Sequence, residues 1–544
     1  MPSLSRILSP ARWRHHAQQY LELWRRNRAD DALDRELQRL QPLKLGAGPA
    51  TIIADGMWRN PNHFFRLRLF LEALSERGDY RLLGILRRRA NRREQRALER
   101  LGFKEFVYLE EDEIATAQFL PEAGRLLANV TSHNDLLALP LPDGLPAYVY
   151  CDTVMKLAAD PRPALTSPLW LKTLAELLRN LAIYRREMAS HQVVEVVLSH
   201  PWKNEWAALT WLALGQGVRA YHLTGFCEGI RIRRFRSQRD YATPVEHLPR
   251  AAFDRLPGDI RHGIARIGLA DLARRASGRS SDLNARYAFN PARRIAGRNE
   301  ARFALSGQTE KPIVVIYGHV WYDFPHTFAM SNFSDFRDWI AATLEQIEKI
   351  DDVIWLLKPH PTEAWYGGFS LANAIEGLPP HVRMLPLETD SQTVINAADA
   401  IVTVHGTIGL EAAAQGVPVI VADRSYYSDW GVAHVATGRD SYFALLREAG
   451  RLPRPDHAAQ ERARACFALA LGEPPDEVGA LRISCDSTGS KLYDEISGRY
   501  RNEQALLARE TARVAAFLAQ DEVDSFAAFH LIETVKRGLI RQAG

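Results

Sequence analysis

The chain has 544 residues, of which 46% are hydrophobic and 25% charged, so we expect a globular protein with at least two domains. Its formal charge of +4 is small for this length, which argues against a nucleic-acid partner attracted by the net charge of the protein. The four cysteines are far apart and form no CxxC pair, so neither a zinc site nor a disulfide framework is predicted. No apolar run is long enough to span a membrane and the N-terminus lacks a signal-peptide core, so we expect a cytoplasmic protein.

Residues 1–46 are predicted to form a basic amphipathic helical arm. Arginines such as Arg12 and Arg25 alternate with apolar residues such as Trp13 and Trp24. This pattern fits a helix packed on the body of the protein. It also fits an arm that contacts a partner or the surface of the inner membrane.

Strand and helix patterns alternate over residues 47–308, which predicts a first Rossmann-like domain. We expect strands at Ala50–Ala54, Tyr80–Leu86, Phe106–Leu109, Leu126–Val130, Ala147–Tyr150, Val193–Leu198 and Val218–Leu223, and helices at Phe64–Glu76, Leu169–Ser190 and Trp206–Leu214.

Ligands bind at the carboxyl ends of strands in such sheets, so two loops of this domain are candidate site walls. The loop Asp55–His63 is also explained as a plain turn, with Asn62 capping the next helix. The loop Ser199–Glu205 contains His200 and a candidate catalytic carboxylate, Glu205. The helix dipole accounts equally well for Glu205 in a first helical turn.

A strongly basic stretch runs from Ile230 to Arg302. Such runs are usually solvated surface, and the alternative is a groove for an anionic acceptor or lipid-linked phosphate. The stretch has few aromatic residues and no nucleic-acid-binding motif, so we predict no nucleic-acid partner.

Residues 309–500 are predicted to form a second Rossmann-like domain. We expect strands at Pro312–Tyr317, Val353–Leu357, Val382–Leu385, Ala400–Val404 and Val417–Val421, and helices at Trp339–Ile350, Asp390–Ala398 and Ile408–Gln415. Residues 501–544 are predicted to be helical and to pack across the domain junction.

Two motifs of the second domain predict a nucleotide site. In Leu-Lys-Pro-His-Pro, the prolines stiffen a loop that presents Lys358, His360 and Pro361 after a strand. In Val-His-Gly-Thr-Ile-Gly-Leu-Glu-Ala, a small-residue turn precedes a helix, whose free N–H groups and dipole favour phosphate. The candidate ligand-binding residues of this turn are His405, Gly406, Thr407 and Glu411. Thr407 is assigned to phosphate, and Glu411 to ribose hydroxyls or to a capping interaction near the helix start.

The loop after the first strand of this domain has the pattern H-x3-D-x2-H, with His319, Asp323 and His326 as candidate catalytic residues. A carboxylate at this edge can act on an electrophilic sugar carbon as base or nucleophile, and Asp323 is the first choice. A metal site is the alternative, but the spacing is not diagnostic of one, so no metal or other cofactor is predicted.

With these motifs, the chain resembles a GT-B glycosyltransferase of the bacterial capsule polysaccharide biosynthesis type, a group that includes Kdo transferases. The resemblance implies an α/β GT-B fold with two Rossmann-like domains facing a central cleft, plus N-terminal and C-terminal helices. The family's HP motif falls on His360 and Pro361, which implies contact with the nucleotide of a CMP-activated sugar. Its Ser/Thr turn falls on Thr407. Those enzymes carry Gln-x3-Asp after the first strand of the second domain, where this chain has His319 and Asp323.

The implied activity is transfer of a sugar from a nucleotide sugar to a glycan or lipid-linked acceptor. One alternative is transfer of polyol phosphate from a CDP-activated donor, which the same motifs would serve. A second is a non-catalytic GT-B-like scaffold in an assembly complex, and a sugar-nucleotide epimerase is a third.

Overall fold

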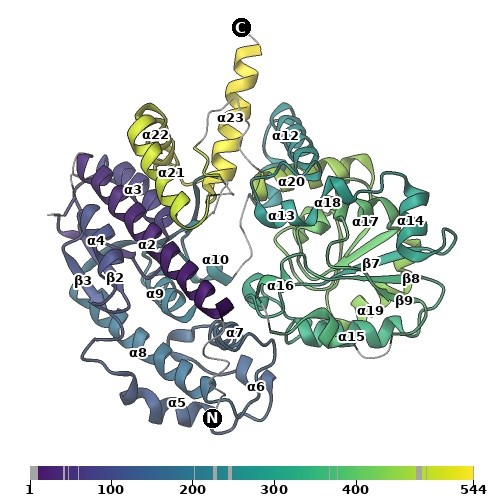
Figure 1. The fold of residues 1–544 in the computed structure, drawn as a ribbon, viewed down its shortest axis with the longest axis horizontal. Coiled ribbons are helices and arrows are strands. Elements are labelled where there is room, and N and C mark those ends of the chain that lie inside the picture. Colours follow the sequence, from purple (N-terminus) through teal and green to yellow (C-terminus); the bar gives the residue numbers. More distant parts are fainter. Residues whose placement is uncertain are drawn as a thin grey trace.

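The computed structural model describes residues 10–40, 43, 45–46, 48–58, 60–200, 202–224, 229–242, 248–366, 368–375, 378–472, 481–484 and 487–542 (Figure 1). It contains two six-stranded sheets, each mainly parallel, and helices from both ends of the chain pack beside them. The expected fold class, two Rossmann-like α/β domains with N-terminal and C-terminal helices, is confirmed.

The first sheet has the strand order β3-β2-β1-β4-β5-β6, and only its edge strand β6 is antiparallel. Its strands are β1 (Ala50–Asp55), β2 (Arg81–Leu86), β3 (Glu105–Tyr108), β4 (Gln192–Leu198), β5 (Arg219–Thr224) and β6 (Arg231–Phe235). Residues 52–54 and 196–198 are almost completely buried, as expected for parallel strands covered on both faces.

The helices of the first domain are α3 (Pro61–Ser75), α4 (Arg92–Arg100), η1 (Thr116–Phe119), α5 (Leu120–Leu127), α6 (His133–Leu137), η2 (Pro142–Gly144), α7 (Ala147–Ala158), α8 (Pro168–Ser190), α9 (Asn204–Gly215) and α10 (Gln238–Ala242). Two strand predictions are wrong, because Leu126–Val130 begins within the end of α5 and Ala147–Tyr150 is the first turn of α7. Apolar runs of four or five residues fit a strand or a helix equally well. The cap prediction is also wrong, since Asn60 rather than Asn62 caps α3.

The second sheet has the order β12-β11-β10-β7-β8-β9, with all neighbours parallel. Its strands are β7 (Ile313–Tyr317), β8 (Ile354–Lys358), β9 (Val382–Met384), β10 (Ala400–Thr403), β11 (Val419–Val421) and β12 (His434–Val435). Its helices are η4 (Pro325–Phe328), α15 (Phe336–Ile347), α16 (Glu363–Tyr366), η5 (Leu371–Ala374), α17 (Ser391–Ala397), α18 (Ile408–Ala413), η6 (Ser428–Trp430), α19 (Arg439–Glu448) and η7 (Ala449–Arg451).

The remaining helices lie outside the strand–helix alternation of the two sheets. They are α2 (Pro10–Arg39), α11 (Arg250–Asp254), α12 (Gly258–Ala276), α13 (Leu283–Ala288), η3 (Pro291–Arg293), α14 (Arg298–Ser306), α20 (His457–Leu471), α21 (Ser490–Asn502), α22 (Gln504–Ala519) and α23 (Phe526–Gln542). Helices α21 and α22 lie against α2 and α3 of the first domain, whereas α12 lies beside α20 of the second (Figure 1).

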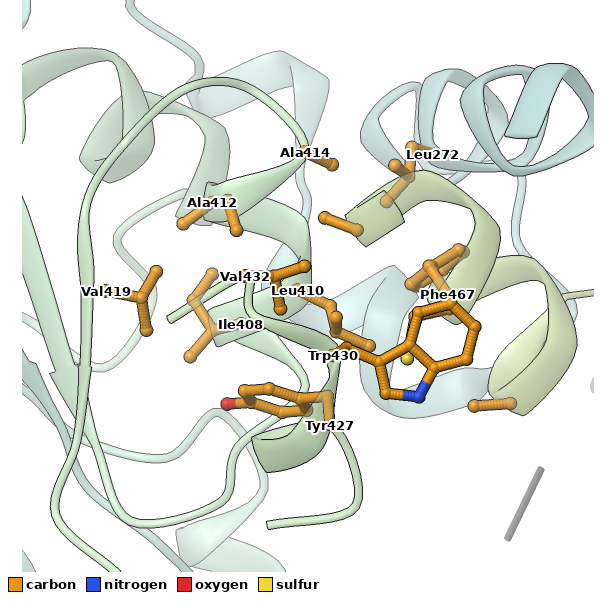
Figure 2. Close-up of a cluster of buried hydrophobic side chains, with 14 of the residues drawn as sticks. Leu272, Ile408, Leu410, Ala412, Ala414, Val419, Tyr427, Trp430, Val432 and Phe467 are labelled. Atoms are coloured by element: carbon orange, nitrogen blue, oxygen red, sulfur yellow. The ribbon is translucent and has the colours of Figure 1, made fainter. Parts of the chain in front are cut away.

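The buried clusters group the chain differently from the predicted boundaries at residues 308 and 500. Leu272 of α12 packs with Phe467 and Trp430 in the core of the second domain (Figure 2). Tyr493 of α21 is buried in the core of the first domain. Helix α23 has Phe526 in the first-domain cluster and Ile532 in the second-domain cluster. The division of the chain by packing therefore differs from a division by sequence position, because α12 packs in the second domain and α21 packs in the first.

The predicted N-terminal arm is a single helix where the structure describes it. The second half of α2 buries Ala29 and Leu33 against the first domain. Leu21, Leu23 and Trp24 are each close to half exposed. None of the helices in the described part of the chain combines the length and apolarity needed to cross a membrane.

Several arginines of the basic stretch bind other parts of the protein. Arg231 donates to the carbonyl oxygens of residues 470 and 471 at the end of α20. Arg234 is fully buried and donates to the carbonyls of Phe517 and Gln520 at the end of α22. Arg236 pairs with Asp521 and Asp524. The expectation of a solvated surface or acceptor groove is wrong for these three residues, because their side chains hold the ends of C-terminal helices.

We predict that Arg234→Ala lowers the free energy of unfolding by about 3 kcal/mol, since the carbonyls of Phe517 and Gln520 and the carboxylate of Asp521 each lose the hydrogen bond from a buried guanidinium. Urea unfolding and hydrogen exchange within α22 measure the effect. Arg233→Ala on the same strand is the control, because the Arg233 guanidinium bonds the Asp240 carbonyl at 3.3 Å and lies over the Phe235 ring. Equal losses in both variants would contradict the assigned role of Arg234.

Candidate functional site

The predicted site residues of the second domain lie on three loops at one edge of its sheet. Strands β10, β7 and β8 are adjacent and parallel, so their carboxyl ends point the same way. The loops that follow them contain residues 404–407, 318–328 and 359–362 respectively. The topology therefore brings the two nucleotide motifs and the H-x3-D-x2-H loop together.

His319, which is buried, and His405, which is partly buried, lie at the base of this edge. The Nε2 atom of His319 lies 3.2 Å from the Thr403 hydroxyl and accepts from the Val404 N–H at 3.3 Å. Its ring stacks on Phe336 at 4.6 Å and lies 4.9 Å from the His405 ring. Burial lowers the pKa of His319 far below its usual value and that of His405 to about 3. Both imidazoles are therefore neutral near pH 7, and His319 ties the loop after β7 to the end of β10.

The lysine of the Lys-Pro-His-Pro loop bonds to the backbone of a neighbouring loop. Lys358 is buried and donates to the carbonyl of Leu387 at 2.7 Å, and burial lowers its pKa to about 8. His360 Nδ1 accepts from the Thr362 hydroxyl at 3.0 Å and from the Thr362 N–H at 3.3 Å, so its proton is on Nε2. Burial and Lys358 lower the pKa of His360 to about 4. Next to Pro361, His360 is thus a neutral N–H donor, and the described residues offer Nε2 no hydrogen-bond partner.

The Gly-Thr turn is built around two tyrosines. The Tyr427 hydroxyl donates to the Gly406 carbonyl at 2.9 Å, and the Tyr426 hydroxyl donates to Thr407 Oγ1 at 3.3 Å. A Cβ atom at position 409 would lie 2.1 Å from the Tyr427 hydroxyl oxygen, so glycine is needed there. The turn is thereby fixed with Thr407 immediately before α18.

Glu411 has a partner inside the protein. Its carboxylate pairs with Arg275 of α12, which also bonds Asp282 at 2.8 Å. The Glu411 side chain is only 4% exposed, and burial raises its pKa. The structure thus shows an internal salt bridge at Glu411, so its role toward a ribose remains a prediction.

Asp323 is the most accessible acidic group of the loop after β7. Its Oδ1 accepts from Lys156 Nζ of α7 at 2.6 Å, and its side chain is 37% exposed. The next residue, Phe324, has φ +54°, and Ala329 has φ +58°, so both adopt the left-handed conformation. Such backbone costs roughly 1–2 kcal/mol per residue and persists only where neighbouring contacts impose it.

His326 supplies such a contact and is not open to a ligand. Its Nδ1 lies 2.6 Å from Asp152 Oδ1 of α7, and its Nε2 donates to the Ser334 carbonyl at 2.8 Å. Its backbone N–H donates to Asp152 at 3.2 Å. The Asp152 carboxylate raises the pKa of His326 against the opposing effect of burial. Both ring nitrogens are therefore engaged within the protein, and the residue joins the two domains.

Glu205 lies in the first domain and pairs with Arg87 at the end of β2. No contact between Glu205 and Asp323 is present in the described part of the chain, although both act electrostatically on Lys203. No sequence motif marks Asp152, Lys156 or Lys203 as a site residue. Asp152 and Lys156 lie in α7, whose first turn is predicted from the sequence as a strand, so the prediction does not place them in one helix.

The described residues include no group of three or more His, Cys, Asp or Glu side chains arranged to hold a metal ion. The groups brought together are a part-exposed carboxylate, a neutral imidazole donor and a small-residue turn before a helix. They can bind a phosphate-bearing ligand and act on it with a carboxylate.

No protein-family model matches the chain, and no curated protein matches it by sequence. Among solved structures, it is similar to the KpsC beta Kdo 2,4 transferase of Thermosulfurimonas dismutans, with 12% identity and a TM-score of 0.34 over 56% of this chain and 88% of that one. The beta Kdo 2,7 transferase of the same organism has 14% identity and a TM-score of 0.32 over 57% and 88%. The UDP-GlcNAc 2-epimerase of Methanocaldococcus jannaschii has 11% identity and a TM-score of 0.27 over 76% and 97%.

The resemblance expected from the sequence is confirmed, in that two Kdo transferases are among the similar solved structures.

We predict that the contact between Asp152 and His326 weakens as pH rises. The pKa of His326 is raised in the folded protein. Protonated His326 therefore makes its full contribution to the free energy of unfolding below the pKa of the unfolded chain, about 6.5. That contribution is lost as pH rises through the pKa of the folded state. Between the unfolded-state and folded-state pKa values, the free energy of unfolding falls by about 1.4 kcal/mol for each pH unit. The melting temperature of the wild type should therefore fall more between pH 6 and 9 than that of His326→Asn. Parallel pH profiles would contradict this assignment.

Proposed function

We propose that the protein is a glycosyltransferase that moves a sugar from a nucleotide sugar to a bacterial surface polysaccharide or glycolipid, with a CMP-Kdo-like donor favoured. The observation that carries the proposal is the meeting of three loops at one sheet edge. They combine Asp323, the His360 donor and the Thr407 turn.

In this proposal the second domain binds the donor. The His360 Nε2–H faces a phosphate or base edge, and the Thr407 turn offers a hydroxyl and backbone N–H groups at the start of α18. Both groups are neutral, so they bind the nucleotide by directed hydrogen bonds. The positive charge nearby belongs to Lys358, whose ammonium is already bound to the Leu387 carbonyl. The choice of a CMP-activated donor follows from the family resemblance of the His-Pro motif.

Asp323 carries the chemistry in this proposal. Lys156 holds Oδ1, which leaves Oδ2 to act at the anomeric carbon. As a base, Oδ2 takes the proton of the acceptor hydroxyl while its oxygen attacks the anomeric carbon and the nucleotide leaves with the bonding electrons. As a nucleophile, Oδ2 itself forms the first bond to that carbon while the nucleotide leaves with the bonding electrons. The acceptor oxygen then displaces Oδ2 from the carbon, and the acceptor proton passes to the released carboxylate. The product's anomeric configuration distinguishes the two, since the first route inverts it and the second retains it.

A non-catalytic scaffold in a polysaccharide assembly complex is the second candidate. The observation that favours it is that Asp323 and Glu411, two of the predicted site residues, are both in internal salt bridges. A scaffold would tolerate the loss of Asp323, whereas the transferase would not.

We predict that Asp323→Asn lowers kcat for transfer by roughly 10²- to 10⁴-fold, because proton transfer or covalent catalysis is lost. Transfer from CMP-Kdo and from UDP, GDP and CDP donors to a glycolipid acceptor measures the effect. The rise in melting temperature on adding the nucleotide should be retained, since Asp323 takes no part in nucleotide binding.

Two further variants complete this experiment. Asp351→Asn, a matched change at an exposed aspartate before β8, should leave transfer unchanged. His360→Ala should abolish the nucleotide-induced shift, because it removes the Nε2–H donor. Full activity of Asp323→Asn would contradict the catalytic role. No nucleotide response in the wild type would favour the scaffold.

We also infer that the protein works in the cytoplasm and at the inner-membrane surface, where a lipid-linked acceptor would be met. The supporting observation is the exposure of Leu21, Leu23 and Trp24 on α2, with Arg28 stacked on Trp24 at 4.9 Å.

We predict that Trp24→Ala lowers co-sedimentation with anionic phospholipid vesicles several-fold. Trp365→Ala, at an exposed tryptophan of the second domain, is the control. Equal binding by both variants would contradict the assignment.

A further inference from the structure

A row of rings connects two lysines at the junction between the domains. The His200 ring lies 5.6 Å from Trp206 and 5.5 Å from Phe324. Lys203 Nζ lies 5.8 Å from the Trp206 ring at one end, and Lys156 Nζ lies 6.0 Å from the Phe324 ring at the other. The lysines and His200 belong to the first domain, and Phe324 belongs to the second.

Helix packing brings together the two segments that carry these lysines. The Asn204 N–H, next to Lys203, donates to Thr153 Oγ1 of α7 at 3.2 Å. Lys156 follows Thr153 by three residues in α7, so both side chains face the start of α9. Lys203 is the residue immediately before α9, at the carboxyl edge of the first sheet.

Lys203 is the surplus cation of this junction. Lys156 is paired with Asp323, and Arg87 is paired with Glu205. Among the described residues, no carboxylate lies within salt-bridge distance of Lys203, which is part-buried. Burial, Arg87 and Lys156 lower the pKa of Lys203, and Glu205 and Asp323 oppose them. A part-buried cation without a paired acid is costly, and an incoming anion would remove that cost.

His200 adds a neutral donor beside the lysines. Its Nδ1 accepts from the Trp202 N–H at 3.2 Å, so its proton is on Nε2. Burial and the two lysines lower the pKa of His200 to about 3, which keeps it neutral.

We propose that Lys203, with Lys156 and His200 beside it, forms a subsite for an anionic group, a carboxylate or a phosphate, on the acceptor saccharide. The proposal rests on the transferase function above, in which the second domain holds the donor and Asp323 lies between donor and acceptor. The subsite is on the first-domain side of Asp323, so the anion it binds belongs to the acceptor.

The test is isothermal titration of the full chain with two matched pairs of saccharides. Methyl glucuronoside and its neutral methyl ester test a carboxylate, and glucose 1-phosphate and methyl glucoside test a phosphate. In the wild type, at least one anionic member should bind about tenfold more tightly than its neutral partner. Added salt should reduce this difference.

Lys203→Gln should remove most of the difference and leave binding of the neutral saccharides unchanged, whereas Lys203→Arg should keep it. Lys172→Gln is the matched control, because Lys172 is an exposed lysine of the same domain, 70% accessible. Equal binding of both members of each pair in the wild type would overturn the proposal. So would a Lys203→Gln variant that binds the anions as the wild type does.

The nucleotide-induced rise in melting temperature separates this proposal from the transferase function. Lys203→Gln should keep that rise, since the nucleotide motifs lie in the other domain. A wild type that binds nucleotide but does not discriminate anions would reject only the subsite. A wild type that discriminates anions without responding to nucleotide would reject only the donor assignment.

Discussion

The buried contact between Asp152 and His326 fixes the loop on which the candidate chemistry depends. Asp152 belongs to α7 of the first domain, and His326 follows Asp323 by three residues in the second. The loop has two residues in the left-handed conformation, which persists only where surrounding contacts exceed its cost. Arg162 adds a second tie from the first domain, bonding Asp335 at 3.2 Å. The position of Asp323 is therefore decided by residues of the opposite domain, and a change at that contact would act on the candidate site without touching the ligand.

Charge pairing separates structural residues from candidate functional ones. Arg234 and Arg236 fix the end of α22, and Arg275 neutralises Glu411 beneath the Thr407 turn. These arginines are engaged within the fold, so they are poor candidates for an acceptor groove although their density in the sequence suggested one. The charged groups that remain part-exposed are fewer, and among them Asp323 lies near enough to Lys203 to act on its charge. In the proposed reaction, Lys203 would orient an acidic acceptor before the acceptor attacks.

The proposed donor side of the site consists of neutral hydrogen-bonding groups. Burial keeps His319, His360 and His405 uncharged, and Lys358 is bound to a backbone carbonyl. Binding of a nucleotide there would depend on directed N–H and O–H donors at the edge of β7, β8 and β10. The proposed acceptor side, in contrast, carries the charged side chain of Lys203. This division predicts that salt affects acceptor binding more than nucleotide binding, because screening acts on charges rather than on neutral donors.

The sequence by itself determined the two Rossmann-like domains and most of their strands. Continuous apolar runs such as residues 313–317 and 354–357 are local signals, and the strand ends placed both nucleotide motifs at one edge. Local patterns failed where a short apolar run fits either structure, as at Ala147–Tyr150 in α7. Only the tertiary structure decided which groups are paired. Lys156 meets Asp323, Arg275 meets Glu411 and Arg234 meets the end of α22 across more than a hundred residues of chain. Such pairings depend on how distant segments pack against each other. Local residue patterns predict helices and strands, but they do not predict which distant side chains come into contact.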